Sequence, residues 1–339
     1  MTIHQFTRAC LLFTLWFASA AASARSGAIV DHVYVAEAVK RGAIVWDVRP
    51  EADFRRGHIP GAVNIGDAGQ ILRNPNTEDF IPIDQIERIL GAAGIDPAQE
   101  MVIYGARAAV IAYFGHYMAQ YFGSTRSSVY HDGIDGWRAA GLPVSSAGHT
   151  RAPVTLKLIV RGANHASTAD VVARMKDPAV QLLDVRTAKE FAGEDIRAIR
   201  GGHIPGAINI PYEQNWVDPD TVQKLARKQV ADNVGMSLKP REDLKALYAR
   251  LDPNRETVVY CQSGVRAAET AAVLAELGFT NVKVYDSSWL GYGNSLELPA
   301  NNAVFLNVGA LNNRIGAMQN RIEALEKELG AARGQKPAP

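Results

Sequence analysis

The stretch of the sequence best suited to chemistry places a cysteine between a predicted strand and a predicted helix. Residues 258–260 form a short β-branched run, and Cys261 follows it directly. Apolar residues then recur at helical spacing over residues 266–277, and Gly278 follows as a stop signal. Residues 262–265 must therefore turn the chain at the carboxyl end of a strand, where open parallel sheets bind their ligands.

A cysteine in such a turn can act as a nucleophile. The first N–H groups of the following helix have no intrahelical acceptor, and the helix dipole adds partial positive charge beside them. Both effects stabilise a thiolate at Cys261, and they would equally hold a persulfide anion. The alternative interpretation is a small buried apolar side chain, which is the usual fate of a free cysteine.

The composition is that of a globular protein, and its net charge does not indicate a strongly charged partner. The chain has 339 residues, of which 47% are hydrophobic and 21% charged, and this length favours two domains. With 36 basic and 35 acidic residues the formal net charge is +1, which gives no support for binding nucleic acid or an anionic membrane.

The amino terminus is typical of an export signal. His4 and Arg8 precede an apolar run, and Ala22-Ser23-Ala24 supplies a cleavage site after Ala24. The run is shorter than the ~20 residues that a membrane span needs. We therefore predict that residues 1–24 are a signal peptide, that the mature protein is periplasmic or secreted, and that it keeps no stable membrane span.

Only two cysteines are present, Cys10 and Cys261. Because Cys10 lies in the predicted signal peptide, the mature chain would hold a single thiol. That thiol has no partner for an intramolecular disulfide and no cysteine cluster for a metal.

The chain contains two copies of one pattern. IVWDVR at 44–49 recurs as QLLDVR at 181–186, and GHIPGAVNI at 57–65 recurs as GHIPGAINI at 202–210. MVIY at 101–104 corresponds to TVVY at 257–260 in the same order. In each copy short β-branched runs alternate with helical stretches, so we predict an α/β fold with two parallel sheets, each covered by helices on both faces.

The sequence resembles the tandem-domain rhodanese family of sulfurtransferases over residues 28–298. The resemblance is carried by both HIPGA segments, both DVR strand ends, the loop CQSGVR from Cys261 to Arg266, and YDSSW at 285–289. It implies that Cys261 takes a sulfane sulfur from a small anionic donor, carries it as a persulfide, and passes it to a thiol or cyanide-like acceptor. It implies no cofactor and no metal.

The two copies differ at the reactive position. Gly105 stands where the second copy has Cys261, and Val110 stands where it has Arg266. We therefore predict a catalytically inactive domain at 28–146, a linker at 147–156 and a catalytic domain at 157–298.

Several polar residues are expected around the cysteine. The resemblance assigns donor binding to Arg186, with an Asp184–Arg186 surface pair as the alternative, and Arg266 is suited to bidentate contacts with donor oxygens. Asp184 would support the loop. Arg197 and Arg200 would bind donor or be solvated. The loop residues that would contact the donor are Gln262, Ser263, Gly264 and Val265.

The donor and the class of activity remain open at this point. An arginine-rich rim suits a compact dianion and favours thiosulfate over 3-mercaptopyruvate. A persulfide relay or scaffold that docks a partner through the C-terminal segment is an alternative function. A phosphatase or arsenate reductase fits less well, because four residues separate Cys261 from Arg266 where the cysteine phosphatases have five.

The C-terminal segment predicts a coiled-coil helix over 304–330 and a disordered tail at 331–339. Apolar residues recur alternately at four and three residues, with Val308, Ile315 and Ile322 at position a and Leu311 and Leu325 at position d. This choice favours a parallel homodimer through residues 304–329. The alternative is an amphipathic helix that packs back on its own domain.

Overall fold

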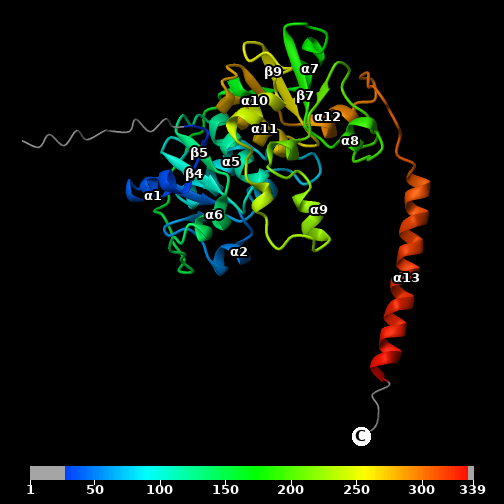
Figure 1. The fold of residues 1–339 in the computed structure, drawn as a ribbon, viewed down its shortest axis with the longest axis horizontal. Helices are drawn as coiled ribbons and strands as arrows, with labels where there is room; N and C mark the ends of the chain where they lie inside the picture. The colour runs from blue at the N-terminus through cyan, green and yellow to red at the C-terminus, as the bar shows by residue number, and fades with distance from the viewer. Residues whose placement is uncertain (1–26, 335–339) are drawn as a thin grey trace, which may run out of the picture.

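The computed structural model describes residues 27–334, which form two α/β halves and a long C-terminal helix (Figure 1). Each half contains a five-stranded parallel sheet, with the strand order β1-β5-β4-β2-β3 in the first and β6-β10-β9-β7-β8 in the second. The two orders are equivalent, which confirms the predicted duplication and the α/β fold class. The predicted signal peptide at 1–24 lies outside the described residues.

The first half follows the predicted alternation and adds short elements that the sequence did not indicate. Its elements are β1 (Ile29–Val30), α1 (His32–Lys40), β2 (Ile44–Asp47), α2 (Glu51–Arg56), β3 (Val63–Asn64), α3 (Ala68–Ile71), α4 (Ile83–Ala92), β4 (Met101–Tyr104), α5 (Val110–Tyr121), β5 (Ser127–Tyr130) and α6 (Gly133–Ala139).

The second half repeats this order with longer insertions. Its elements are η1 (Gly162–Asn164), β6 (His165–Ala166), α7 (Thr168–Arg174), β7 (Val180–Asp184), α8 (Ala188–Ala192), β8 (Ile208–Asn209), η2 (Tyr212–Asn215), α9 (Thr221–Ala226), η3 (Val234–Met236), α10 (Arg241–Leu247), β9 (Glu256–Tyr260), α11 (Val265–Leu277), β10 (Val282–Tyr285) and α12 (Ser288–Asn294).

Both faces of each sheet are buried, which is why most strand positions are apolar. In β2, Ile44 and Trp46 belong to the core between the halves, whereas Val45 belongs to a separate core under α1, α2 and α6. Alternate side chains of a strand point to opposite faces, so one strand serves both cores. In the second half, α7 and α12 cover the outer face in the same way.

One apolar core joins the two halves. Helix α11, which follows the cysteine loop, packs against α5, its counterpart in the first half. Phe114 of α5 and Leu274 of α11 are both almost fully buried in this core, together with strand residues of both sheets. The cysteine loop is thereby held at the junction between the halves.

The segments outside the two halves match their predictions in part. The predicted linker at 147–156 has no helix and runs along α4, where the amide of Val154 donates to the carbonyl of Gly91. The C-terminal helix, α13 (Val308–Gly334), projects away from the body of the molecule (Figure 1).

Helix α13 begins later and ends later than predicted. It starts at Val308 because residues 304–306 pair instead with the second half, where Val304 accepts a hydrogen bond from Gly201 and the amide of Leu306 donates to Ile199. Residues 331–334, predicted as part of a disordered tail, are helical, and 335–339 lie outside the described residues. In the described part of the chain, no helix combines the length and apolarity that crossing a membrane requires.

Candidate active site

The cysteine loop connects β9, the central strand of the second sheet, to α11, as predicted. Gly264 ends the loop with φ +81°, a left-handed conformation that glycine adopts without strain. A Cβ atom at this position would lie 2.8 Å from the Cα atom of Asp286, so the close approach of the two segments also requires glycine. The side chain of Cys261 is 1% exposed.

Ser288 fixes the loop from the neighbouring strand end. Its Oγ accepts hydrogen bonds from the amides of Cys261 and Gly264, each at 3.0 Å, and donates to the carbonyl of Tyr285 at 2.6 Å. Ser288 is completely buried and has φ +48°, an uncommon conformation for a residue with a side chain. Sequence reasoning did not single out this residue, although it belongs to the YDSSW segment.

The first turn of α11 offers free donors beside the loop. Within residues 27–334, the amides of Val265, Arg266 and Ala267 donate to no protein acceptor. Unpaired amides and the positive end of the dipole of this 13-residue helix both favour an anion nearby. This arrangement suits a thiolate or persulfide on Cys261.

Arg266 lies at this helix start, where its guanidinium group is paired with a carboxylate that the sequence analysis missed. Its Nη1 and Nη2 atoms donate to the two carboxylate oxygens of Glu190, each at 2.8 Å. Burial alone would raise the pKa of Glu190, but the hydrogen bonds and charge of Arg266 and the amide of Thr187 outweigh it and lower the pKa to about 2. Glu190 therefore stays ionised and holds Arg266 in place.

The insertion after Arg186 lies beside the loop, as expected. Gln262 Nε2 donates to the carbonyl of Arg197 at 2.7 Å, and the Arg197 side chain, 53% exposed, contacts Glu190 at 3.2 Å. Arg197 thus presents a partly free cation at the edge of the site. Ser263 accepts a hydrogen bond through its carbonyl, from Arg73 of the first half at 2.8 Å.

Arg186 does not lie on the edge of the site, contrary to expectation. It is 1% exposed, and its Nε and Nη2 atoms donate to Asp184 and to the carbonyl of Gly202. Asp184 is likewise completely buried in this pair, so the pair is not at the surface either. In the first half, Arg49 makes the same contacts with Asp47 and Gly57, where no cysteine is present.

Arg200 is also buried rather than placed to meet a donor. Its guanidinium group donates to the carbonyls of Gly293, Ser295 and Leu298, at 3.1, 2.9 and 2.8 Å. These bonds tie the insertion to the segment that follows α12. The expectation for Arg200 was wrong because several carbonyl groups that accept no helical hydrogen bond converge at the end of α12. No pattern in the sequence indicates this arrangement.

In the first half, the loop that corresponds to the cysteine loop is contacted by residues of the second half. Arg107 in this loop donates to Asn233 at 3.1 Å, and Asn233 donates in turn to Asp135 at 2.8 Å. His131 bonds to the carbonyl of Met236. With Gly105 at the position of the cysteine, this loop offers a contact between the halves in place of a nucleophile.

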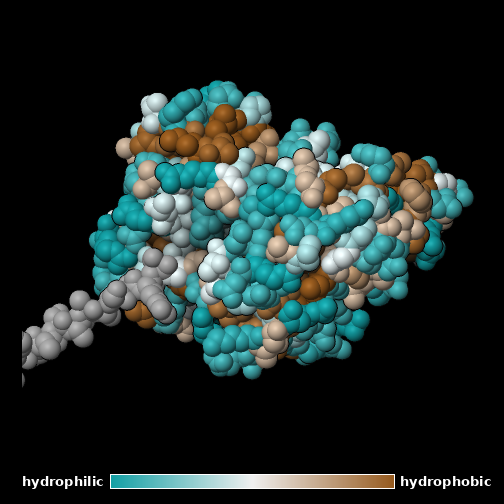
Figure 2. All heavy atoms as spheres, turned by 90° about the horizontal axis from the view of Figure 1, so that it is seen from above, coloured by the Kyte–Doolittle hydropathy of each residue, from teal (hydrophilic) through white to brown (hydrophobic). Residues whose placement is uncertain are grey.

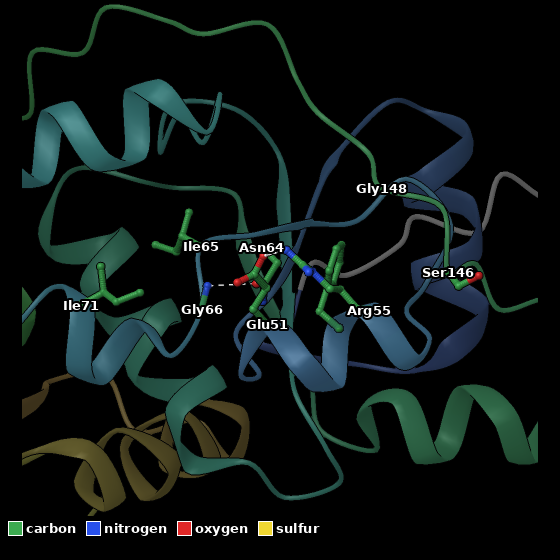
Figure 3. A pocket seen from close by; sticks show the side chains of 9 residues that line it. Glu51, Arg55, Asn64, Ile65, Gly66, Ile71, Ser146 and Gly148 are labelled. Carbon is green, nitrogen blue, oxygen red and sulfur yellow. Dashed lines mark hydrogen bonds and ion pairs between the residues drawn. The ribbon is translucent and has the colours of Figure 1, made fainter.

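A cavity of the first half lies away from the cysteine. It has a volume of about 670 Å³ and belongs to the first half, where Glu51, Arg55, Asn64 and Ile71 line it (Figure 3). Glu51 and Arg55 pair with each other, and the Asn64 amide group donates to the carbonyls of Asp47 and Arg49. These polar groups are already satisfied, so we place no chemistry there.

Comparison with known proteins agrees with the geometry of the loop. A sequence model of the rhodanese-like domain matches residues 32–140 and 167–295. The chain belongs to the rhodanese family. The thiosulfate sulfurtransferase of Corynebacterium glutamicum is 34% identical over 255 residues, which cover 72% of this chain and 79% of that protein. This rhodanese is accordingly an enzyme of the sulfurtransferase type.

Solved structures share the fold of this rhodanese at lower sequence identity. Wild-type EanB superposes with a TM-score of 0.67 at 20% identity, over 82% of this chain and 69% of that chain. The anaerobic ergothioneine biosynthesis enzyme of Chlorobium limicola, in complex with trimethyl histidine, gives a TM-score of 0.68 at 20% identity, over 82% and 70%. At this identity the likeness describes the fold.

The buried Arg186–Asp184 pair generates a prediction for this rhodanese. Arg186→Gln should lower the free energy of unfolding by about 3–5 kcal/mol, because Asp184 would be left buried without its cation. Arg49→Gln in the first half is the matched control and should cost a similar amount. Urea unfolding of both variants checks this. A normally stable Arg186→Gln protein with a raised KM for the sulfur donor would instead support the donor-binding role.

Glu269 of α11 is a second buried carboxyl group behind the loop. Trp216 Nε1 donates to its Oε1 at 2.9 Å, while Oε2 has no partner within the described residues. Burial, reinforced by the nearby charge of Glu213, raises the pKa of Glu269 to about 8. The folded protein therefore keeps this group protonated at neutral pH, whereas the unfolded chain releases the proton above its ordinary pKa.

This difference predicts that Glu269 makes stability fall with rising pH. From about pH 5 to pH 8 the folded state binds one proton more than the unfolded state, so this group should lower the unfolding free energy by about 1.4 kcal/mol per pH unit. Glu269→Gln should remove that slope and be the more stable protein at pH 8, and exposed Glu297→Gln should not. Urea unfolding across this range would contradict the assignment if the Glu269→Gln and wild-type curves ran parallel.

Proposed function

We propose that this rhodanese carries sulfur as a persulfide on Cys261, taking it from thiosulfate and passing it to a thiol or cyanide-like acceptor. The observation that carries the proposal is the placement of Cys261 in a loop held by Ser288 at the unpaired start of α11. The Corynebacterium glutamicum relative named thiosulfate sulfurtransferase supports the choice of donor.

Each step balances without a cofactor. The Cys261 thiolate attacks the outer sulfur of thiosulfate, the sulfur–sulfur bond of the donor breaks, and sulfite leaves with the bonding electron pair. A persulfide anion remains on Cys261. An acceptor nucleophile then attacks the terminal sulfur, and the thiolate returns as the leaving group.

The surroundings of Cys261 favour a compact donor. Its side chain is 1% exposed, so a small dianion suits the site better than a bulkier one. Arg197 is the partly exposed cation at the edge, and Arg266, held by Glu190, lies further in. The alternative donor is 3-mercaptopyruvate, which would require a proton for the pyruvate enolate that leaves. Comparing kcat/KM for the two donors decides between them.

We also propose that the protein is exported and works in the periplasm or outside the cell. The support is the apolar run and the Ala22-Ser23-Ala24 site of the sequence, which lie outside the described residues. Amino-terminal sequencing of the protein recovered from the producing cells should give a chain that begins at Arg25. A protein that begins at residue 1 and stays in the cytoplasm would contradict this.

The persulfide mechanism predicts a sulfur adduct on one residue. After incubation with thiosulfate, mass spectrometry of the intact protein should show a gain of one sulfur atom, mapped to Cys261 and removed by cyanide. Cys261→Ser should show no gain and no turnover while keeping wild-type stability. Thr280→Ala, an exposed position beyond the far end of α11, is the control and should keep the adduct. A protein that gains no sulfur from any sulfane donor would reject the proposal.

We further propose that α13 joins two copies of the chain as a parallel coiled coil. The apolar side chains at positions a and d are between 41% and 65% exposed, so the helix does not pack on its own domain. Figure 2 shows apolar atoms at the end of the molecule that carries α13. Arg321 at position g would meet Glu326 at position e of the second copy, which complements the apolar contact.

If α13 forms a coiled coil, the protein should be a dimer, and a single charged residue in the apolar seam should abolish it. Analytical ultracentrifugation of the full chain at micromolar concentrations should give a dimer, and Ile322→Asp should give a monomer because it places a charge in the seam. Asn320→Asp, on the opposite side of the helix, should remain dimeric. A monomeric wild-type protein over the whole concentration range would contradict the dimer and favour a different partner for α13.

A further inference from the structure

Arg73 brings a cation from the inactive half to the cysteine loop. It follows α3 and begins a short hairpin that closes through a β-bridge between Arg73 and Phe80. Its side chain extends to the second half, where Nη2 donates a hydrogen bond to the carbonyl of Ser263 at 2.8 Å. Arg73 is 4% exposed, and its contact with Ser263 is partly buried.

The guanidinium group of Arg73 is held in a fixed place but only partly neutralised. It lies 4.9 Å from the ring centroid of Phe114, which belongs to the core between the halves. Among residues 27–334, its one carboxylate contact is a single ion pair with Glu78 at 3.3 Å, and the Glu78 side chain is 40% exposed. An exposed, screened carboxylate compensates a buried cation poorly.

Two further counter-charges of Arg73, Cys261 and Asp286, lie on the second half. Burial lowers the pKa of Arg73, and the charges of Glu78, Cys261, Asp286 and Asp79 oppose that shift. An arginine keeps its proton even when buried. The site therefore contains a permanent positive charge that a thiolate on Cys261 would help to balance.

The other charged and titratable groups around Cys261 are less available for this purpose. Arg266 lies within the electrostatic reach of Cys261 but already makes two hydrogen bonds with Glu190. Tyr212 lies within the same reach and is neutral at physiological pH. His165 faces the carboxylate of Asp286, at 3.7 Å.

We propose that Arg73 is a positioning residue of the reaction, which holds the loop through Ser263 and stabilises the anionic sulfur on Cys261. The first half would then contribute a side chain that acts on the sulfur of Cys261. This inference rests on the proposed function of Cys261. It adds Arg73, a residue of the first copy, to the site around Cys261. Neither the comparison of the two copies nor the cysteine-loop motif assigns a role to this residue.

The reciprocal contact between the halves supplies a matched control. Arg107 of the first half is 7% exposed and donates to Asn233 of the second half, as Arg73 donates to Ser263. Both arginines cross the same junction and are buried. Of the two, Arg73 contacts the loop that carries Cys261, so the two variants separate a local charge effect from a general loss of packing.

The test measures how the rate of Cys261 alkylation by iodoacetamide depends on pH, in the full-length protein and without any sulfur donor. Arg73→Met keeps an apolar contact with Phe114 and should move the midpoint of the curve upward by about one pH unit, because a neighbouring cation is lost. Arg73→Lys keeps a charge and should lie between the two. Arg107→Gln should leave the midpoint unchanged.

A second variant decides the matter if Arg73→Met does not fold. Glu78→Gln removes the exposed partner of Arg73 and should move the midpoint downward. Unmoved curves in the folded Arg73 and Glu78 variants, or an equal shift in Arg107→Gln, would overturn the inference. Because alkylation needs no donor, these results stand apart from whether the wild-type protein gains sulfur from thiosulfate, which tests the proposed function itself.

Discussion

The hydrogen bonds from the amides of Cys261 and Gly264 to the hydroxyl group of Ser288 are the constraint on which the site depends. They tie the end of β9 to the turn after β10, so the loop cannot shift without breaking both. The conformation is demanding on each side, because Gly264 and Ser288 both have positive φ values. Once the loop is fixed, the first amides of α11 have a defined position, and a sulfur anion on Cys261 gains stabilisation without further ordering.

Duplication has produced two similar halves with different uses for the same loop. Their sheets share one strand order, and their equivalent helices α5 and α11 pack together. In the first half the loop has Gly105 at the position of the cysteine and binds Asn233 of the second half. In the second half the loop keeps its cysteine and receives Arg73 of the first. Each half thus completes the loop of the other.

The sequence was a good guide to the fold and to the place of the cysteine loop because both depend on short-range patterns. Alternating apolar runs located the main strands, and a strand end followed by a helix start located Cys261. Residues that act across the fold were missed. Glu190, Ser288 and Arg73 lie 71, 27 and 188 positions from Cys261 in the sequence, and no local pattern marks them.

The wrong expectation for Arg186 has a physical reason that the sequence contained. An arginine two residues after a strand-end aspartate can fold back on it, and both copies carry this pair. Because the first copy has the same pair of residues but no cysteine, the pair itself indicated a structural role for Arg186. Arg200 carried no such signal. The start of α13 was also misplaced, because the pairing of Val304 with Gly201 joins segments far apart in the sequence.

The central claim is that the loop beginning at Cys261 holds a sulfur anion through its amides. A crystal structure of the protein after incubation with thiosulfate measures this most directly. We predict density for one additional sulfur bonded to Cys261 Sγ, within hydrogen-bonding distance of the amides that open α11 and with the Ser288 contacts intact. An unmodified thiol, or an added sulfur turned away from those amides, would contradict the account.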